Sequence, residues 1–531
     1  MPEPVSHNLA WHTAVARAVS AAPIAAAALA GAAVLLRAPL NHDVAWHLIA
    51  SRRVLGGERL YIDILETNPP LIVWLSAIPA RLADATGISD QRAVALCAGL
   101  VLAACTGLAA GLLGRTAGVS ARLRSLVVGS LLIAGSVVFA ASIGQREHLA
   151  FLLMLPYLVA AARQPDQPMS RALLVAVGLL AGVGTAIKPD FVLPIVGVEA
   201  LVAVRRGSLA ALRRPEVIAL AATQGICLVA LLAVTPQYVF EFLPWMWGLY
   251  SSYDVDRRVL LQRHDVWVMA FGLGTAVCVG LSERGTAAAG LCGAAGGAGL
   301  GFLAAYWLQA KGFGYHLRPI QGLALVSSVL LIWWAARVVL RRPPDRRWSW
   351  RTRGVAAIIG LIGLGLLTVT GRAASRQAAG LLRPQPSVPP ALVALVKAEA
   401  SGQPIFVLST SIWPAFPLVN VTAATWPYRY PFLWPLPAFY GRRSTGQAGG
   451  YRRPEEQGPL ERTFVGAVVD DLAAHPPRLL IVDRSPRKQA LEGRAFDYVE
   501  YFSLSPRFAS LFSRYRRVGA VGPFDVYAQT R

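Results

Sequence analysis

The sequence predicts an α-helical polytopic membrane protein that carries an α/β domain at its C-terminal end. Hydrophobic residues make up 55% of the 531 residues and charged residues only 15%, and the mean hydropathy is +0.48. This composition excludes a disordered chain and an ordinary soluble domain. Apolar runs of roughly 16 to 24 residues, long enough to cross a bilayer, recur from residue 19 to residue 371. Beyond residue 374 prolines are frequent and no run can span.

The apolar runs predict about eleven spanning helices. They lie near 19–40, 93–114, 125–143, 148–162, 172–187, 190–204, 216–234, 265–281, 286–308, 318–340 and 354–371. The first run is expected to be a retained helix, because no convincing signal-peptide cleavage site precedes Asn41. The run 69–87 begins with two prolines and carries Arg81 and Asp84, so we expect it to lie in the outer interface.

The formal net charge of +22 comes largely from arginines in short loops between apolar runs. If 69–87 does not span, these loops all fall on one side of the membrane, which the positive-inside rule makes cytoplasmic. The loops hold Arg115, Arg122, Arg124, Arg163, Arg171, Arg205, Arg206, Arg213, Arg214 and the segment 341–353. We therefore expect a multi-pass inner (plasma) membrane protein with a cytoplasmic N-terminus. No recognition module accompanies the charge, so nucleic acid is not an expected partner.

The composition change divides the chain into a transmembrane domain, residues 1–373, and an exoplasmic domain, residues 374–531. Strand-like runs at 404–409, 478–483 and 524–528 alternate with helix-like stretches at 461–474 and 506–515. This order predicts a small α/β domain. The stretch 413–440 is rich in Trp, Pro and Tyr. It either packs against the membrane mouth of the protein or forms an aromatic interface belt.

All five cysteines lie inside apolar segments without metal-like spacing, so they are expected to be small core residues. We expect neither a metal nor a cofactor, because no metal cage is visible. The Gly/Ala-rich run 285–301 predicts close helix packing.

Ionisable residues gather at the helix mouths that this topology places on the outer face. Charged groups at a membrane face are costly unless they have a task there. Their convergence predicts one polar active site at the outer surface. The candidate residues are Asp43, His47, Asp63, Glu66, Arg146, Glu147, Lys188, Lys311, His316 and Arg318.

Two carboxylates of the first outer loop each have two interpretations. Asp43 directly follows the first helix, where a carboxylate can serve as general base towards a hydroxyl. It can equally cap a helix that begins near Val44. Glu66 could hold an acceptor or a metal, or it could anchor the interfacial helix.

The later loops supply cations. Arg146 and Glu147 share a tight outer turn, either as site residues or as a structural ion pair. Lys188, Lys311, His316 and Arg318 can form a cationic cradle for a phosphate; the alternative is snorkelling at the interface. The chain has only four lysines, and two of them, Lys188 and Lys311, lie at predicted outer helix mouths.

These residues resemble a known family. An acid just after the first helix, the pattern Gly-Gly-Glu-x-x-Tyr-x-Asp at 56–63, and an acid followed by Pro-Pro-Leu at 66–71 are similar to motifs of the GT-C class of glycosyltransferases. Within that class the protein mannosyltransferase and aminoarabinose transferase superfamily is the most similar, and the pattern at 515–527 also resembles its bacterial exoplasmic domains. The resemblance covers nearly the whole chain as architecture, whereas the sharp motifs occupy about the first 150 residues.

The resemblance implies a polyprenyl-phosphate sugar as donor and transfer at the outer face to an envelope acceptor, which can be a lipid, a glycan or a protein. It assigns the base to Asp43 and the second acid to Glu147. Two departures stand out. Many members have Asp-Glu where this chain has Asp43-Val44, and the second loop, often Arg-x-Asp or a lone Asp, is here Arg146-Glu147.

Two other functions stay open. A flippase for lipid-linked sugars would place polar residues along the bilayer midplane, and few charged positions lie in the middle of the predicted helices. A polymerase or ligase for lipid-linked oligosaccharides often uses a large outer loop within the bundle rather than a C-terminal α/β domain.

Overall fold

The computed structural model describes residues 5–164, 167–340, 350–382, 386–441, 450–491 and 495–530, with side chains from residue 21 onward. The chain forms two compact units. The helical unit comprises Met1–Ala38, Ala95–Cys227 and Val255–Pro384; the mixed unit comprises Pro39–Val94, Leu228–Asp254 and Gln385–Arg531. Of the basic segment predicted to be cytoplasmic, residues 341–349 lie outside the described residues, as do 383–385 of the proline-rich segment.

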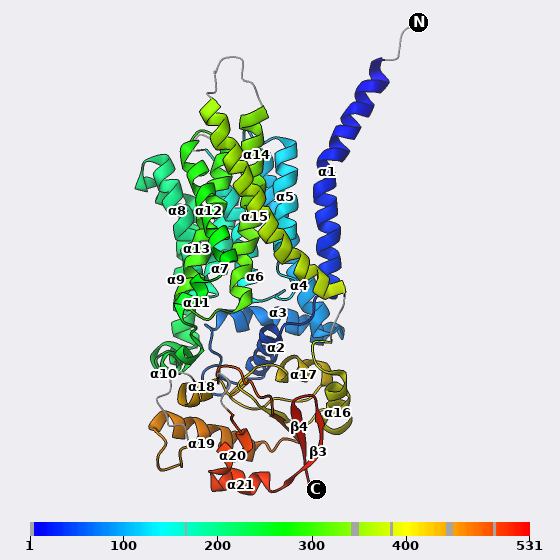
Figure 1. The fold of residues 1–531 in the computed structure, drawn as a ribbon, viewed down its shortest axis with the longest axis vertical. Helices are drawn as coiled ribbons and strands as arrows, with labels where there is room; N and C mark the ends of the chain where they lie inside the picture. The colour runs from blue at the N-terminus through cyan, green and yellow to red at the C-terminus, as the bar shows by residue number, and fades with distance from the viewer. Residues whose placement is uncertain are drawn as a thin grey trace. The chain divides into compact units, whose positions relative to one another are not determined.

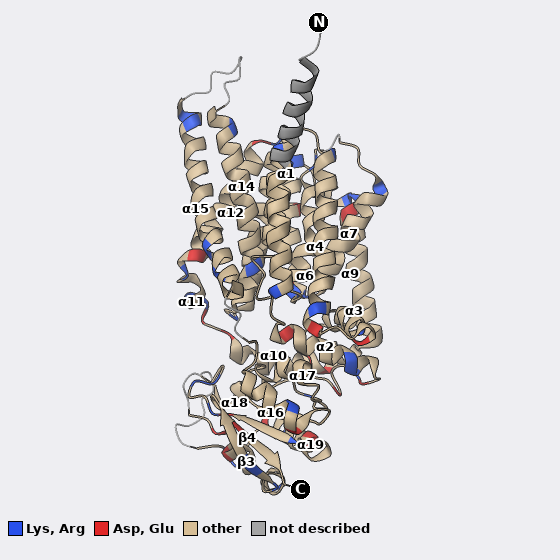
Figure 2. Ribbon diagram, turned by 90° about the vertical axis from the view of Figure 1, so that its right-hand side faces the viewer, with Lys and Arg blue, Asp and Glu red and all other residues tan. Residues whose placement is uncertain are grey.

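Long helices build the helical unit (Figure 1). They are α1 (Val5–Arg37), α4 (Asp90–Arg115), α5 (Ala121–Gly135), α6 (Arg146–Ala161), α7 (Arg171–Ala186), α8 (Val192–Arg206), α9 (Pro215–Val234), α12 (His264–Ser282), α13 (Ala287–Gln309), α14 (Arg318–Leu340) and α15 (Trp350–Leu382). The short helices η1 (Pro189–Phe191), η2 (Leu209–Arg213), α11 (Arg257–Leu261) and η5 (Gly314–Leu317) connect them. Helices α4 and α9 continue into the mixed unit. The middle turns of α14 and α15 carry no Lys, Arg, Asp or Glu (Figure 2).

Fewer helices than predicted are long enough to cross a membrane. Among the described residues six qualify by length and composition, and seven do if α1 and α2 together form one broken span. The predicted count of about eleven is therefore not confirmed. Four of the predicted spans fall on α5 to α8, which have 15 or 16 residues. At 1.5 Å per residue such helices are about 24 Å long, less than the roughly 30 Å of a hydrocarbon core.

Glycines of α13 bring neighbouring backbones into contact, as the Gly/Ala-rich run predicted. A Cβ atom on Gly197 of α8 would lie 2.3 Å from the carbonyl oxygen of Gly297. A Cβ on Gly301 would lie 2.4 Å from the oxygen of Leu193. Backbone atoms cannot retreat from such a clash, so these positions of the α8–α13 packing require glycine.

Some of the arginines predicted to orient the protein take part in a buried ion network. Arg214 pairs with Glu199 of α8 and lies 3.1 Å from Glu216 of α9. Arg163 lies 2.5 Å from Glu216, and the Tyr157 hydroxyl donates to Glu199 at 2.7 Å. These charges are nearly buried, so the network joins α6, α8 and α9 in addition to any role in topology. Glu199 was not singled out from the sequence.

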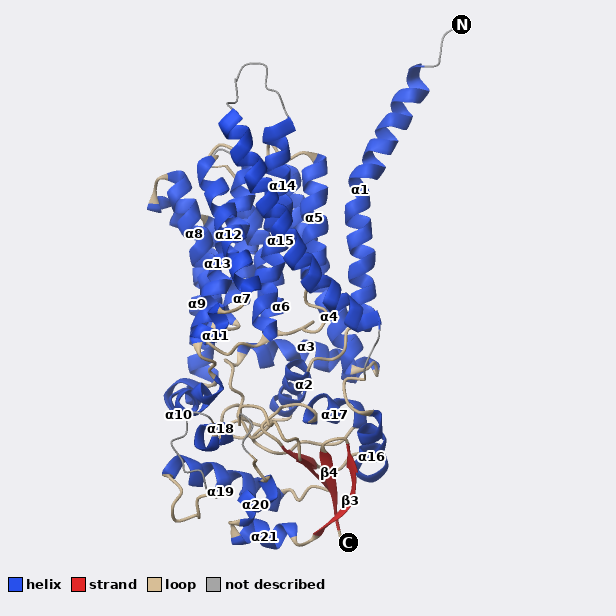
Figure 3. Cartoon of the chain, in the orientation of Figure 1, coloured by secondary structure: helices blue, strands red, loops and turns tan. Residues whose placement is uncertain are grey.

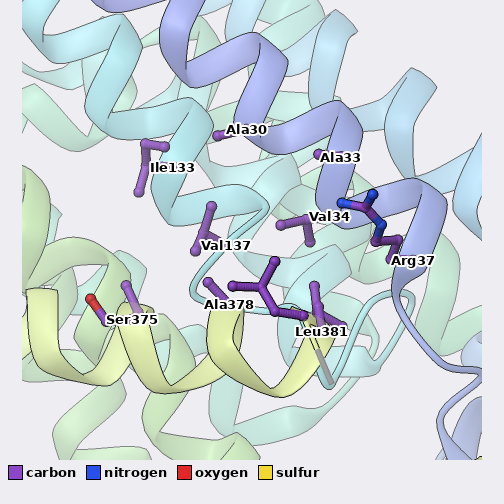
Figure 4. A pocket seen from close by; sticks show the side chains of 11 residues that line it. Ala30, Ala33, Val34, Arg37, Ile133, Val137, Ser375, Ala378 and Leu381 are labelled. Atoms are coloured by element: carbon purple, nitrogen blue, oxygen red, sulfur yellow. The ribbon is translucent and has the colours of Figure 1, made fainter. Parts of the chain in front are cut away.

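An apolar groove lies between α1, α5 and α15 (Figure 4). Its volume is about 360 Å³, and Arg37 is its one charged lining residue within the described chain. The lining residues are Ala30, Ala33, Val34, Arg37, Ile133, Val137, Ala374, Ser375, Ala378, Leu381 and Leu382. None of the predicted site residues lines this groove.

Shorter helices and one sheet make up the mixed unit (Figure 3). Its elements are α2 (His42–Leu55), α3 (Leu71–Thr86), η3 (Tyr238–Phe242), α10 (Leu243–Tyr250), η4 (Ser251–Tyr253), α16 (Pro390–Ala400), β1 (Ile405–Leu408), α17 (Ala415–Thr422), α18 (Leu436–Tyr440), α19 (Pro459–Ala474), β2 (Leu479–Asp483), α20 (Tyr498–Ser503), α21 (Pro506–Phe512), β3 (Tyr515–Val521) and β4 (Phe524–Gln529).

The sheet has the strand order β1-β2-β4-β3. β1 and β2 are parallel, with Ile405 opposite Leu479, and the other two pairs are antiparallel. β1 and β2 are buried throughout, which explains the apolar runs Ile405–Leu408 and Leu479–Val482. The three predicted strands are confirmed. Tyr515, which was assigned to the end of a helix, instead begins β3, an edge strand whose exposed arginines hide the strand pattern.

The aromatic stretch 413–440 packs within the mixed unit against the first predicted outer loop. Arg53 donates to the carbonyl oxygen of Tyr428 at 2.6 Å. The backbone N–H of Leu65 donates to the oxygen of Arg429 at 2.9 Å. These bonds attach the C-terminal region to the loop that carries Asp63 and Glu66.

Candidate active site

Three helix ends of the helical unit assemble a charged cluster. α6 begins with Arg146 and Glu147 in its first turn, where a carboxylate suits the positive end of the helix dipole. After α7, Lys188 is extended (φ −151°, ψ 136°) and Pro189 starts η1. The third contributor is η5, which carries His316. Lys188 and His316 thus sit in short connections between helices. Arg146 and Glu147 instead follow residues 136–145, which separate α6 from α5, so the tight turn predicted for them is wrong.

Glu147 is the centre of the cluster. Its Oε1 atom lies 3.9 Å from Lys188 Nζ and 3.5 Å from His316 Nε2, and its Oε2 atom lies 3.9 Å from Arg146 Nε. The side chain is 2% exposed. Within the described chain neither carboxylate oxygen accepts a hydrogen bond. Surrounding positive charge therefore offsets only part of the cost of burying this carboxylate.

Arg146 and Lys188 also contact residues other than Glu147. The Arg146 Nη2 atom lies 3.4 Å from the Tyr315 hydroxyl, and its guanidinium is 5.8 Å from the centre of the Tyr315 ring. Lys188 donates to Gln309 Oε1, and Gln309 Nε2 donates to Asp190 Oδ2. Lys188 also lies 3.9 Å from Asp190. Gln309, the last residue of α13, therefore clamps a lysine and an aspartate together.

Asp190 lies in η1, between α7 and α8. Burial raises the pKa of its carboxyl above the ordinary value, and the charge of Lys188 opposes that rise. Its side chain is 17% exposed and that of Lys188 is 18% exposed, compared with 7% for Arg146. The lysine and aspartate thus form the more accessible side of the cluster.

The structure brings together four of the six residues that were predicted from the later loops: Arg146, Glu147, Lys188 and His316. The charge of Lys311 acts on His316 as well. Arg318 donates from Nη1 to Gln321 of its own helix at 2.9 Å.

Gln309, Tyr315 and Asp190 were not among the site residues predicted from the sequence. Gln309 ends α13 and Tyr315 lies in η5. Both residues are neutral, so unlike a charged residue they do not stand out in an apolar sequence. A partner for Lys188 more than a hundred residues away is not visible in the local pattern.

In the mixed unit, Asn41 is the N-cap of α2. Its side-chain oxygen accepts the backbone N–H of Asp43 at 2.9 Å, so the capping role considered for Asp43 belongs to Asn41. The Asp43 carboxylate lies in the first turn, 3.4 Å from His42 Nε2, and is 16% exposed. The assignment of Asp43 as general base stays a hypothesis, now without the competing cap.

The side chain of Glu66 is 3% exposed, and both of its carboxylate oxygens accept hydrogen bonds. It accepts the indole N–H of Trp46 at 2.5 Å and, at its other oxygen, both the backbone and side-chain N–H groups of Asn68 at 2.8 and 2.5 Å. His47 Nε2 lies 3.7 Å away. These contacts fix the turn before α3 onto α2, and they favour the anchoring interpretation of Glu66.

Asp63 closes the loop that contains the Gly-Gly-Glu pattern. It accepts the backbone N–H of Arg59 at 2.9 Å and its Nε–H at 3.0 Å. The hydrogen bond from the Arg59 side chain lowers the pKa of Asp63. Gly57 (φ +99°) provides the turn that a residue with a side chain would resist. The pattern thus builds a compact loop next to α2.

The described residues contain no group of three or more His, Cys, Asp or Glu that could hold a metal ion. All five cysteines are free thiols. Cys105 and Cys292 are buried, Cys97 and Cys227 are half-buried, and Cys278 is exposed, so the expectation that all five are core residues is wrong for Cys278.

The sequence matches no protein-family model and no curated protein. Its fold is similar to that of the GT-C class of glycosyltransferases, as the motifs predicted. ArnT (aminoarabinose transferase) from Cupriavidus metallidurans, crystallised with undecaprenyl phosphate, matches with a TM-score of 0.50 and 14% identity, over 99% of this chain and 98% of that chain. ArnT in its apo state gives a TM-score of 0.46 at 13% identity, over 95% and 97% of the two chains. The arabinofuranosyltransferase AftD from mycobacteria gives 0.41 at 15% identity, over 96% of this chain and 40% of that chain.

Proposed function

We propose that this protein is a membrane glycosyltransferase. It moves a hexosyl or pentosyl group from a polyprenyl-phosphate donor to an envelope acceptor, a lipid, glycan or protein, at the outer face of the plasma membrane. The observation that carries the proposal is the buried cluster of Arg146, Lys188 and His316 around Glu147. It lies in a chain whose fold resembles that of ArnT, which was crystallised with undecaprenyl phosphate.

The cations of the cluster suit a phosphate. A guanidinium such as that of Arg146 can bind two phosphate oxygens at once, and Lys188 can act as a point charge. When the sugar leaves, the prenyl phosphate gains negative charge. Cations that are already in place stabilise that developing charge more strongly in the transition state than in the ground state.

Asp43 serves as the general base. It takes the proton of an acceptor hydroxyl while that oxygen attacks the anomeric carbon of the donor. The bond from this carbon to the phosphate oxygen breaks, and the electron pair leaves with the prenyl phosphate, so the configuration inverts. His47, Asp63 and Glu66 act near the substrate by fixing the loop beside α2.

The same proposal places the N-terminus and the arginine loops in the cytoplasm and the C-terminal region outside. Cysteines introduced at two exposed positions test this: Ala210 in η2 and Ser510 in α21. A membrane-impermeant maleimide should label Ser510→Cys in intact cells and Ala210→Cys only after permeabilisation. Equal labelling of both in intact cells contradicts the topology.

The activity is tested in cells and with purified protein. The cell-envelope glycans of a deletion strain should lack one substituent by mass spectrometry, and the wild-type gene should restore it. The Asp43→Asn variant should not restore it, whereas Asp470→Asn, an exposed control, should. An unchanged envelope in the deletion strain refutes the proposal. A purified protein that moves a labelled lipid-linked sugar across a liposome membrane without transferring it favours the flippase instead.

A further inference from the structure

The Glu147 carboxylate occupies the region where the donor's phosphate would be bound. It is buried, it lies 3.5 to 3.9 Å from three basic groups, and its oxygens accept no hydrogen bond in the part of the chain that the structure describes. A carboxylate and a phosphate are both anions and prefer the same partners. Glu147 and the donor would therefore compete for Arg146 and Lys188.

Each of the two cations also has a contact other than Glu147. The Arg146 guanidinium contacts the Tyr315 hydroxyl, and the Lys188 ammonium donates to Gln309. Replacing the carboxylate by an amide of the same shape removes one negative charge and leaves these anchors in place. The local charge then becomes more positive by one unit.

Charge also distinguishes donor from product. A sugar-linked prenyl phosphate is a diester with one negative charge, whereas the released prenyl phosphate is a monoester with about −1.5 to −2 charges at neutral pH. Cations without a counter-charge would hold the product more tightly than the donor. Product release would then limit turnover.

We propose that Glu147 is a specificity-determining residue that competes with phosphate for Arg146 and Lys188 and so limits how tightly the prenyl-phosphate product is retained. The idea rests on the proposed function and gives Glu147 a role distinct from proton transfer. Asp190, on the more accessible side of Lys188, contributes a second and weaker counter-charge.

Equilibrium binding of a prenyl monophosphate to the purified full-length protein in phosphatidylcholine nanodiscs tests the role. Glu147→Gln should bind about tenfold more tightly than wild type, which corresponds to about 1.4 kcal/mol. Glu147→Asp moves the carboxylate back by the length of one methylene group, so its affinity for prenyl monophosphate should lie between those of wild type and Glu147→Gln. The exposed control Glu399→Gln should match wild type. In turnover, the KM for the donor and kcat should both fall in Glu147→Gln, a pattern that simple loss of structure does not produce.

Acylation of lysines gives an independent readout, because the chain has only Lys188, Lys311, Lys397 and Lys488. Prenyl monophosphate should protect Lys188 but not Lys397, and in Glu147→Gln it should do so at about tenfold lower concentration. If wild type binds and both Glu147 variants bind equally or more weakly, the competition is refuted and the proposed function stands. If wild type neither binds the lipid nor shows protection of Lys188, the cluster is no phosphate site and both proposals fail.

Discussion

Gln309 joins the cationic and acidic sides of the cluster, so replacing it with methionine should release Lys188. The amide accepts from Lys188 and donates to Asp190, and methionine has similar volume but can do neither. A hydrogen bond to a charged group contributes about 1.5 to 3 kcal/mol. Loss of the bond to Lys188 should therefore raise the population of freely accessible ammonium roughly tenfold to a hundredfold.

Acylation of the four lysines, followed by peptide mass spectrometry, measures that change. In Gln309→Met the rate at Lys188 should rise at least tenfold relative to Lys397, while the exposed control Gln262→Met leaves the ratio unchanged. The KM for the donor should rise as well, because the Lys188 ammonium is no longer held in place by Gln309. An unchanged Lys188 to Lys397 ratio in a folded Gln309→Met protein would refute the clamp.

Three further predictions concern stability. Gly297→Val should lower the stability in thermal unfolding by about 1 to 3 kcal/mol or more, because a Cβ atom there would lie 2.8 Å from a backbone oxygen of α8. The control Gly274→Ala has open space around the new Cβ atom and should leave thermal unfolding unchanged. Arg214→Met should cost about 3 to 5 kcal/mol, since it removes the cation that pairs with the buried carboxylate of Glu199, whereas Glu216 keeps its contact with Arg163. An unchanged unfolding midpoint would contradict the network. Arg59 lowers the pKa of Asp63, so their ion pair stabilises the folded protein fully above the ordinary aspartate pKa, and this stabilisation is lost as the pH falls through the lowered pKa. Asp63→Asn should remove this acid-dependent part of the unfolding free energy, about 1 kcal/mol or less. Equal pH profiles of unfolding for the variant and wild type would disprove it.

Much of the cluster was predictable because charges at the ends of apolar runs stand out. Arg146, Glu147 and Lys188 each follow or precede a hydrophobic segment, and an ionisable residue there is costly without a purpose. Gln309 carries no charge and ends an apolar helix, so only the three-dimensional structure reveals that it holds Lys188.

Other features exceeded what a local pattern can determine. Asn41 and Asp43 are both good capping residues two positions apart, and only backbone geometry shows that Asn41 caps α2. The apolar runs 125–143 and 148–162 look like spans, although the helices α5 and α6 that they form have only 15 and 16 residues. The exposed edge strand β3 lacks the alternation that identifies a strand.

The rate of sugar transfer by purified Asp43→Asn tests the central claim most directly. Asparagine keeps the shape of the side chain and cannot accept a proton as a base, and the cap of α2 stays with Asn41. With a polyprenyl-phosphate sugar and acceptor, the transfer rate should fall by about 10² to 10⁴ while binding of prenyl monophosphate is unchanged. Transfer within a few-fold of the wild-type rate would contradict the assignment of Asp43 as the base and with it the proposed mechanism.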